Sequence, residues 1–200
     1  MDYNNYDYST KKYRLFYYRI DGTITVFSMT GAKLSSFDGS RLKDAINISV
    51  NGAGLSKIIL PENSEVLTEM SLEGNNFTEI DLSKYPALKT IALNSNKLTS
   101  IDFSKVPNLE VASVSYNQLT DVKFGNNNLW GLYLDNNNLS EIDFTGAPHI
   151  SQLTLAKNKL SDLNVDMLNE LKVLVINDNC FTFKTLPLHK SSYIVYYYNN

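Results

Sequence analysis

The chain has 200 residues, of which 43% are hydrophobic and 20% charged, so it has the length and composition of one globular domain with a sizeable core. Its formal net charge of -3 argues against nucleic acid as a partner, and the lack of a long apolar run argues against insertion of this segment into a membrane. The single cysteine, Cys180, excludes an internal disulfide framework and a cysteine-based zinc cluster.

The first 44 residues carry strand and turn signals. Two runs rich in β-forming residues flank Asp21 and Gly22, a pair that favours a two-residue turn, so we expect a β-hairpin. The sequence SRLKDAI, residues 40–46, predicts a short helical turn with Ser40 as its N-cap. We therefore expect residues 1–44 to form an N-terminal cap.

A repeat of about 21 residues follows, over residues 45–186. LTEMSLEGNNFTEIDL from Leu67 matches LKTIALNSNKLTSIDF from Leu88 and LWGLYLDNNNLSEIDF from Leu129, and the general unit is LxxLxLxxNxLxxIxF. Self-similarity at a fixed period indicates a repeat architecture, here of about six to seven coils. A weaker unit starts at Ala45, and one unit is shortened by a residue at FGNNNL, residues 124–129, where we expect a local irregularity.

The spacing within the unit predicts its local structure. The LxL alternation is a strand signal, because side chains two residues apart share one face of a strand. The LxxIxF part fits neither a helix nor a sustained strand, so we expect extended or 3-10 structure on the opposite side. A lone coil cannot bury enough apolar surface to offset its ordering entropy, so several coils must stack.

The repeat resembles a leucine-rich repeat, and its linker style is similar to the short repeats of bacterial surface proteins of Bacteroidetes type and, more loosely, to internalins. The resemblance implies a right-handed solenoid, of the α/β leucine-rich repeat class by convention but mostly β here, with a parallel β-sheet on its concave face. It also implies a cell-surface or secreted bacterial protein. Because residues 1–19 lack the features of a signal peptide, that location requires a leader outside this sequence, and a cytoplasmic location stays open.

One asparagine recurs in each repeat, at a spacing of 21 residues with one interval of 20. An asparagine side chain offers donors and an acceptor on a short arm, which suits it to pair the backbone groups that a chain leaves unpaired where it turns off a parallel strand. We therefore expect a structural asparagine ladder made of Asn75, Asn96, Asn117, Asn137, Asn158 and Asn179.

The binding candidates lie at the variable positions around the LxL strand, which face the concave side. Most of these positions are small, and Tyr133 is the large aromatic residue among them; tyrosine is a frequent hot-spot residue in recognition. An alternative is that Tyr133 merely fills the concave surface above Gly131 and Ala112. The candidates for partner contact are Tyr133, Tyr116, Asp135, Trp130, Lys157, Glu69 and Glu73.

No constellation for catalysis, metal or cofactor binding stands out. His149 and His189 lack spaced partners, and nothing pairs with Cys180 to form a nucleophile. Sequons at Asn47, Asn76 and Asn138 are largely by-products of the repeat, so we do not expect functional glycosylation. We expect a chain that is not an enzyme and needs no cofactor.

The period breaks after Phe181, and an aromatic run follows, so we expect residues 187–200 to form a C-terminal cap or the start of a linker. The favoured function is recognition of a protein or peptide through the concave face. A structural spacer of a larger surface protein is one alternative, and a glycan-binding module using Trp130 and Tyr133 is another.

Overall fold

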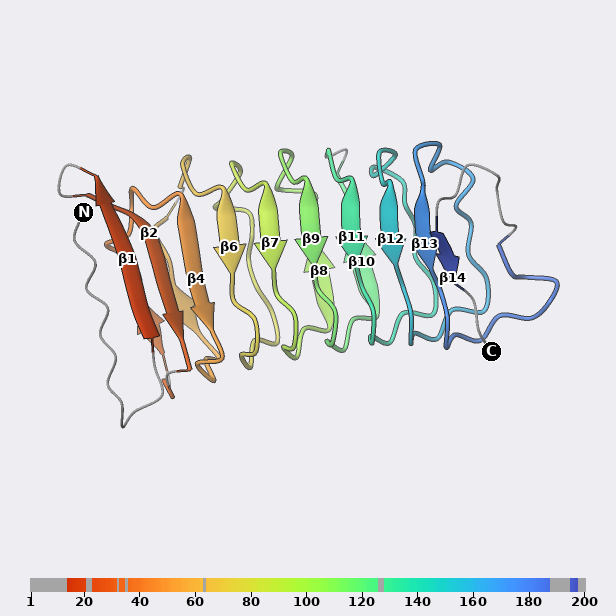
Figure 1. Ribbon diagram of the computed structural model, residues 1–200, viewed down its shortest axis with the longest axis horizontal. Helices are drawn as coiled ribbons and strands as arrows, with labels where there is room; N and C mark the ends of the chain where they lie inside the picture. The colour runs from red at the N-terminus through yellow and green to blue at the C-terminus, as the bar shows by residue number, and fades with distance from the viewer. Residues whose placement is uncertain are drawn as a thin grey trace.

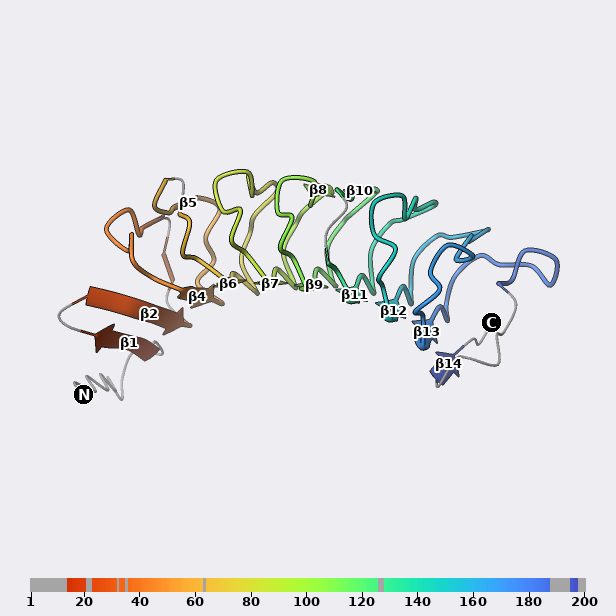
Figure 2. The ribbon, with the colours of Figure 1, turned by 90° about the horizontal axis from the view of Figure 1, so that it is seen from above.

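The computed structural model describes residues 14–20, 23–31, 33–34, 36–62, 64–125, 128–187 and 195–197, and the statements below concern these residues. The chain winds into an elongated stack of coils, each of which adds one strand to a long sheet (Figure 1). Seen from above, the stack is arched, and its strands line the inner side of the arch (Figure 2). The expected solenoid with a concave, largely parallel sheet is confirmed.

The concave sheet has ten strands, in the order β1-β2-β4-β6-β7-β9-β11-β12-β13-β14. β1 pairs with β2 antiparallel, and each later neighbour pairs in parallel. Parallel pairing follows from the repeat, since every coil returns the chain to the same edge in the same direction. The strands are β1 (Arg14–Ile20), β2 (Thr23–Thr30), β4 (Asn47–Asn51), β6 (Glu69–Ser71), β7 (Thr90–Ala92), β9 (Val111–Ser113), β11 (Gly131–Tyr133), β12 (Gln152–Thr154), β13 (Val173–Val175) and β14 (Val195–Tyr197).

The leucine positions of the repeat form a continuous core between the concave sheet and the outer side. The central residue of each short strand is buried and pairs in register with its counterpart in the next coil, as Leu132 does with Leu153. The second leucine of each LxL pattern, such as Leu134, is also buried. Because side chains alternate along a strand, the residues between them are left on the concave surface.

Each coil leaves its strand through a residue with a left-handed backbone, placed just before the ladder position. Glycine holds this position in the first coils, as at Gly74 with φ of 64°. In later coils it is held by residues with a side chain, at some steric cost. These are Ser95, Tyr116, Asn136, Lys157 and Asp178, with φ from 56° to 58°.

The outer, convex side is extended and turn-rich, and the described residues contain no helix there or elsewhere. Of the two expected alternatives, extended or 3-10, the extended form is found. Two short pairs of parallel strands occur on this side, β3 (Phe37–Asp38) with β5 (Ile58–Ile59) and β8 (Ser100–Asp102) with β10 (Asp121–Lys123). Phe124 packs between Phe103 and Phe144, with ring centroids 6.2 and 6.1 Å away, so the coils are also joined through their outer halves.

The shortened repeat brings the backbone of one coil against the coil before it. A β-carbon built on Gly125 would lie 2.4 Å from Cα of Ser104, a distance at which one of the two backbones must move. Glycine is therefore required where the repeat has lost a residue. Residues 126 and 127 of the same turn lie outside the described part of the chain.

The N-terminal hairpin forms as expected from β1 and β2, while its turn residues 21 and 22 lie outside the described part. In place of the expected helical turn at residues 40–46, the chain makes two successive turns, closed by bonds from Leu42 N–H to Gly39 O and from Ala45 N–H to Leu42 O. Ser40 caps no helix; its N–H donates to Asp38 Oδ1 at 2.9 Å. The same pair of turns recurs at residues 82–88, so the coil geometry extends N-terminal of Ala45.

The C-terminal aromatic run continues the sheet. Val195, Tyr196 and Tyr197 form β14, which pairs in parallel with β13. Before it, the chain leaves the solenoid after Phe181 and turns back at residues 182–186. His189 and the rest of residues 188–194 lie outside the described part.

Candidate functional site

The six repeated asparagines follow the strands of the coils from β6 to β13, one per coil; five are buried in the stack, and Asn179, in the last of these coils, is partly exposed. Asn117 Nδ2 donates to the carbonyl oxygens of Leu93 and Val114 at 3.0 and 3.1 Å, and its Oδ1 accepts the N–H of Leu98 at 3.0 Å. These bonds pair backbone groups of two coils, which water cannot reach at a buried position. Equivalent bonds are made by Asn75, Asn96, Asn137, Asn158 and Asn179.

Between β4 and β13 the concave surface consists of three columns of side chains that follow the register of the strands. Most are small and polar, so the surface has few protruding groups. We call these residues the concave columns. The first column is Asn47, Glu69, Thr90, Val111, Gly131, Gln152 and Val173; the second is Ser49, Ser71, Ala92, Ser113, Tyr133, Thr154 and Val175; the third, just past the strands, is Asn51, Glu73, Asn94, Ser115, Asp135, Ala156 and Asn177.

Tyr133 lies back along its own strand and covers Gly131. A β-carbon built on Gly131 would meet Cε2 of Tyr133 at 3.5 Å and Cγ2 of Val111 at 3.6 Å, both ordinary contacts. The tyrosine hydroxyl donates to Oε1 of Gln152, in the next coil, at 2.8 Å. The ring is thus held at both ends, in a half-buried position with part of its surface open to the concave side.

Trp130 lies directly before Gly131, on the side of the stack where the strands begin, which we call the strand-entry edge. The residue is 41% exposed, and its backbone carbonyl accepts the N–H groups of Ser151 and Gln152 at 2.9 Å. At the equivalent position of earlier coils, Lys89 pairs with Glu110 at 3.1 Å. Trp130 and the ring of Tyr133 therefore flank the start of the same strand.

Tyr116 and Lys157 lie at the opposite edge, where strands end. Both occupy the left-handed position before a ladder asparagine, and both side chains are exposed. Asn136 holds the same position in the coil between them. The structure therefore separates Tyr116 and Lys157 from Trp130, which lies across the width of the sheet.

Asp135 is committed to bonds within the protein. Its carboxylate accepts the hydroxyl of Thr154 at 2.5 Å and the N–H of Ala156 at 2.8 Å. Asn94 and Asn51 tie their following coils in the same way, to Ser113 and Ser115 and to Ser71 and Glu73. These bonds form a second ladder on the concave side, which connects the coils in pairs.

Glu69 and Glu73 flank Ser71 on the β6 coil, far from Tyr133 along the stack. Glu69 Oε2 accepts the side-chain amide of Asn47, and Glu73 Oε1 accepts that of Asn94, each at 2.5 Å. The described residues place no lysine or arginine against either carboxylate. The two groups are therefore oriented by neutral donors and keep their negative charge facing the concave side.

Three polar residues that the sequence did not single out as site residues form hydrogen bonds with candidate residues that it did. Gln152 holds the hydroxyl of Tyr133, and Asn47 and Asn94 orient the two glutamates. All three belong to the concave columns, so the register of the repeat places them beside their partners. Their side chains alone carry no signal that sets them apart from other polar surface residues.

On the convex side a repeated turn carries an aspartate two residues before a serine or threonine. Asp81, Asp102 and Asp143 each accept a backbone N–H at 2.8 to 2.9 Å. Hydrogen bonds from Ser83, Ser104 and Thr145 hold the pKa of these carboxyls below the ordinary value of 3.8. The aspartates thus stabilise local turns.

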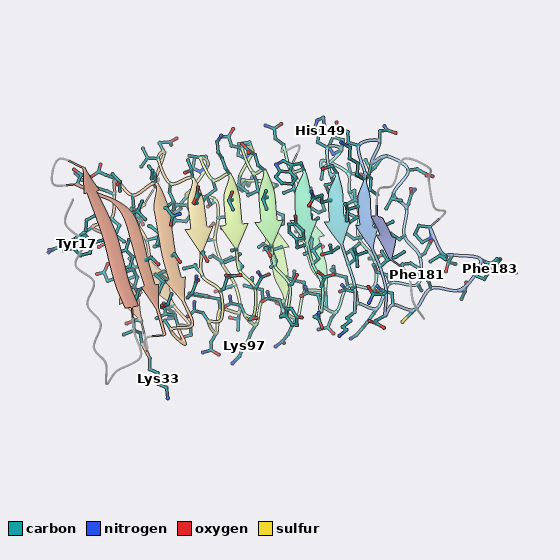
Figure 3. The ribbon with its side chains drawn as sticks, in the orientation of Figure 1. Tyr17, Lys33, Lys97, His149, Phe181 and Phe183 are labelled. Atoms are coloured by element: carbon teal, nitrogen blue, oxygen red, sulfur yellow. The ribbon has the colours of Figure 1, made fainter. Side chains whose placement is uncertain are left out.

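The remaining reactive side chains do not converge. His149, at the edge of the stack where the strands begin (Figure 3), has its Nδ1 2.8 Å from Glu170 Oε1 in an exposed pair, and Cys180 is exposed. Within the described residues, no three histidine, cysteine, aspartate or glutamate side chains form a group that could hold a metal ion. The same part of the chain has no helix with the length and apolar character needed to cross a bilayer.

A search against protein-family models finds no match, and a comparison with curated protein sequences finds none either. Solved structures do match. A leucine-rich repeat protein of Leptospira interrogans aligns over 86% of this chain and 48% of its own length, with 21% identity and a TM-score of 0.71. Internalin C2 of Listeria monocytogenes aligns over 90% of this chain and 81% of its own length, with 20% identity and a TM-score of 0.69.

A third structure, the complex of TLR13 with ssRNA13, aligns over 69% of this chain and 23% of the receptor chain, with 22% identity and a TM-score of 0.58. The present chain thus spans about half the length of the Leptospira protein and a smaller part of TLR13. Identities this low establish a shared fold and no shared ligand. The coil geometry and these similarities together identify the fold of the chain as a leucine-rich repeat solenoid.

Proposed function

We propose that the chain is a non-enzymatic binding module that recognises a protein or peptide through the concave columns, with Tyr133 at the centre of the contact. The observation that carries the proposal is the fixed position of the Tyr133 ring, packed over Gly131 and bonded to Gln152. A side chain that is already ordered loses little entropy on binding, so its contact area contributes more fully to affinity.

The surroundings of Tyr133 support this role. Its neighbours in the second column, Ser113 and Thr154, are small, so a partner can approach the ring along the stack. Trp130 adds a second partly exposed aromatic surface at the strand-entry edge. Aromatic anchors surrounded by smaller contacts are the usual composition of energetically dominant interface positions.

The edge residues Tyr116 and Lys157 and the carboxylates Glu69 and Glu73 extend the proposed contact surface, whereas Asp135 contributes mainly by holding adjacent coils together. A partner that touched all of these would have to cover both the width and much of the length of the sheet. The core of the proposed site is therefore Tyr133 with Trp130.

The similar structures bear on where the protein acts, and the charges of the concave columns bear on the class of its partner. The similarity to proteins of Leptospira and Listeria supports a bacterial surface or secreted setting for this module. The solved TLR13 complex contains RNA, but the concave columns of this chain include glutamates and an aspartate and no lysine or arginine, which disfavours a polyanion. Protein or peptide thus remains the proposed partner class.

Selection from a random-peptide display library tests the proposal. Peptides enriched on the wild-type chain are expected to bind at least about tenfold more weakly to the Tyr133→Ala variant, since loss of a hot-spot side chain costs more than about 1 kcal/mol. Tyr133→Phe, which keeps the ring, is expected to retain most of the affinity. Lys105→Ala, an exposed change outside the concave columns, is the matched control.

Peptides that bind the double variant Tyr133→Ala, Tyr116→Ala as tightly as the wild type would contradict the proposal. Circular dichroism of Tyr133→Ala and of the double variant checks that any loss of binding does not come from unfolding. A glycan-binding module, the alternative that also uses Trp130 and Tyr133, would instead give glycan-array signals that vanish on Trp130→Ala. A chain that selects no ligand of either class would fit a structural spacer.

A further inference from the structure

We infer that the concave face accepts a partner segment that is cationic where it meets the β6 coil and apolar where it meets the β9 to β13 coils. The inference rests on the proposed function and specifies the chemistry of its partner. It follows from an uneven distribution of charge and apolar surface along the concave columns. The small net charge of the whole chain does not reveal this uneven distribution.

The charged side chains of all three concave columns have one sign. From β4 to β13 the concave columns contain Glu69, Glu73 and Asp135 as acidic residues and no lysine or arginine. Two lysines lie directly before strands of these coils: Lys89, before β7, is paired with Glu110 at 3.1 Å, and Lys172, before β13, lies at the apolar end of the face, away from the β6 coil. A cationic partner therefore meets opposite charge there, whereas an anionic one meets uncompensated repulsion.

Glu69 and Glu73 are arranged to receive such a partner. Each carboxylate is turned by one amide donor, from Asn47 and Asn94, at 2.5 Å. A carboxylate has about four acceptor sites, so one neutral hydrogen bond leaves capacity for the donors of an arginine or lysine. Asp135 has less spare capacity, because a hydroxyl and a backbone N–H already donate to its two oxygens, one to each.

The apolar half of the face begins two strands further along the sheet, at Val111 of β9, and Tyr133 of β11 lies three strands from β6. Val111, Tyr133, Val173 and Val175 are all half-buried members of the first two columns. Neighbouring strands lie about 4.8 Å apart, so the path from β6 to β11 is about 14 Å, or about four residues of an extended chain. The partner segment thus carries its basic and apolar residues about four positions apart.

Synthetic peptides of about six residues match this spacing and serve as probes. The first has two arginines at one end, two valines at the other and serines between them, and a second has the reverse order because the direction of the bound chain is not set by charge. A third replaces the arginines with glutamates, and a fourth replaces the valines with serines. Trp130 is the single tryptophan of the sequence, so its fluorescence reports binding without a label, and calorimetry supplies Kd independently.

One of the two arginine–valine peptides is expected to bind, with affinity that falls as ionic strength rises. Glu69→Gln combined with Glu73→Gln is expected to weaken it about tenfold or more, because both charges are lost while the acceptor oxygens for Asn47 and Asn94 remain. Glu79→Gln, an exposed change in the same coil outside the concave columns, is the matched control and is expected to leave Kd unchanged. The serine replacement of the valines is expected to weaken binding as well.

Three outcomes would each overturn the inference. The glutamate peptide could bind as tightly as the arginine peptides or more tightly, the arginine peptide could bind the double glutamine variant as tightly as the wild type, or none of the four peptides could bind. The proposed function is judged separately by the library-selected peptides. If those lose affinity with Tyr133→Ala but not with the double glutamine variant, the proposed function stands and the inference fails. If they lose affinity with neither, both fail.

Discussion

The ladder asparagines show how a single residue type holds this fold together. At the end of each strand the backbone turns away from its neighbours, and one buried side chain pairs groups of both its own coil and the previous coil. Leucine or alanine at the same place would leave donors and acceptors unpaired away from water, which costs more than the bonds themselves contribute. The hydrogen-bonding groups of the asparagine side chain therefore matter more at this position than the volume of the side chain.

Asn117→Ala is expected to lower the free energy of unfolding by about 1 to 3 kcal/mol, because it leaves the N–H of Leu98 and the carbonyl oxygens of Leu93 and Val114 without their partner. Urea denaturation followed by circular dichroism measures the change. Gln118→Ala, at the adjacent exposed residue, is the control and is expected to change stability by less than about 0.5 kcal/mol. Equal midpoints for wild type and Asn117→Ala would argue against the ladder as a source of stability.

At the scale of elements, the convex side is built from recurring polar turns, in the place where a leucine-rich repeat otherwise carries a helix or a 3-10 segment. The aspartate of each turn accepts the N–H of the residue two positions later, and Asn164 replaces it in one coil with the same bond, to Asp166 at 2.9 Å. The bond therefore needs an acceptor oxygen and not a charge. The charge instead makes the turns sensitive to acid.

Acidification is expected to destabilise the fold through these turns. Because the pKa of Asp81, Asp102 and Asp143 lies below the ordinary 3.8 in the folded chain, their contribution is fully present above that value and is lost as the pH falls through the lower folded-state pKa. The triple change of these residues to Asn keeps an acceptor, as Asn164 shows. Its melting temperature is therefore expected to fall less than that of the wild type below about pH 4.

Thermal melts across a pH series measure this difference. A variant that neutralises Asp44 and Asp121, two exposed residues outside these turns, serves as the control and is expected to follow the wild-type curve. Parallel curves for the wild type and the triple variant would show that the turn aspartates contribute nothing to acid sensitivity.

At the scale of the whole molecule, stability depends on covered ends. Each coil contacts mainly its neighbours, so a terminal coil exposes the apolar edge that the next coil would bury. At the N-terminus β2 pairs with β4 over five residue pairs, and Phe27 and Met29 pack against the core. We retain as a proposal that residues 1–44 act as a cap, residues 45–186 as the repeats, and residues 187–200 as a C-terminal cap or linker.

Removal of residues 1–30 is expected to lower the free energy of unfolding by several kcal/mol, since it removes the pairing of β2 with β4 and two partly buried side chains, and full burial of one such side chain contributes about 1.5 to 3 kcal/mol. The urea midpoint and the binding of a hydrophobic dye measure the loss and the newly exposed surface. A variant that lacks only residues 1–12 keeps both hairpin strands and is expected to behave like the full chain. A shortened chain starting at Gly31 with an unchanged midpoint would argue against the cap.

The repeat architecture was predictable because its signals are local and periodic. The LxL alternation at Leu132 and Leu134 defines a strand in any coil, and the recurrence of asparagine needs no knowledge of the neighbouring coil. The loss of one residue at 124–129 likewise predicted an irregular junction, and Gly125 of this turn packs closely against the backbone of Ser104. The helical turn expected at Ser40 does not form, because residues 39–45 make the same pair of turns as residues 82–88 and a capping residue alone does not specify a helix.

The contacts of the candidate site depended on the tertiary structure. Tyr133 meets Gln152 because residues 19 positions apart come into register one strand apart, and the same stacking sets Asn47 against Glu69 and Asn94 against Glu73. Such pairs depend on rotamers chosen among several polar neighbours. The sequence by itself thus determined the coil, its period and its buried ladder, whereas only the assembled stack decided which concave side chains are bonded internally and which face a partner, because that choice is made between coils and not within one.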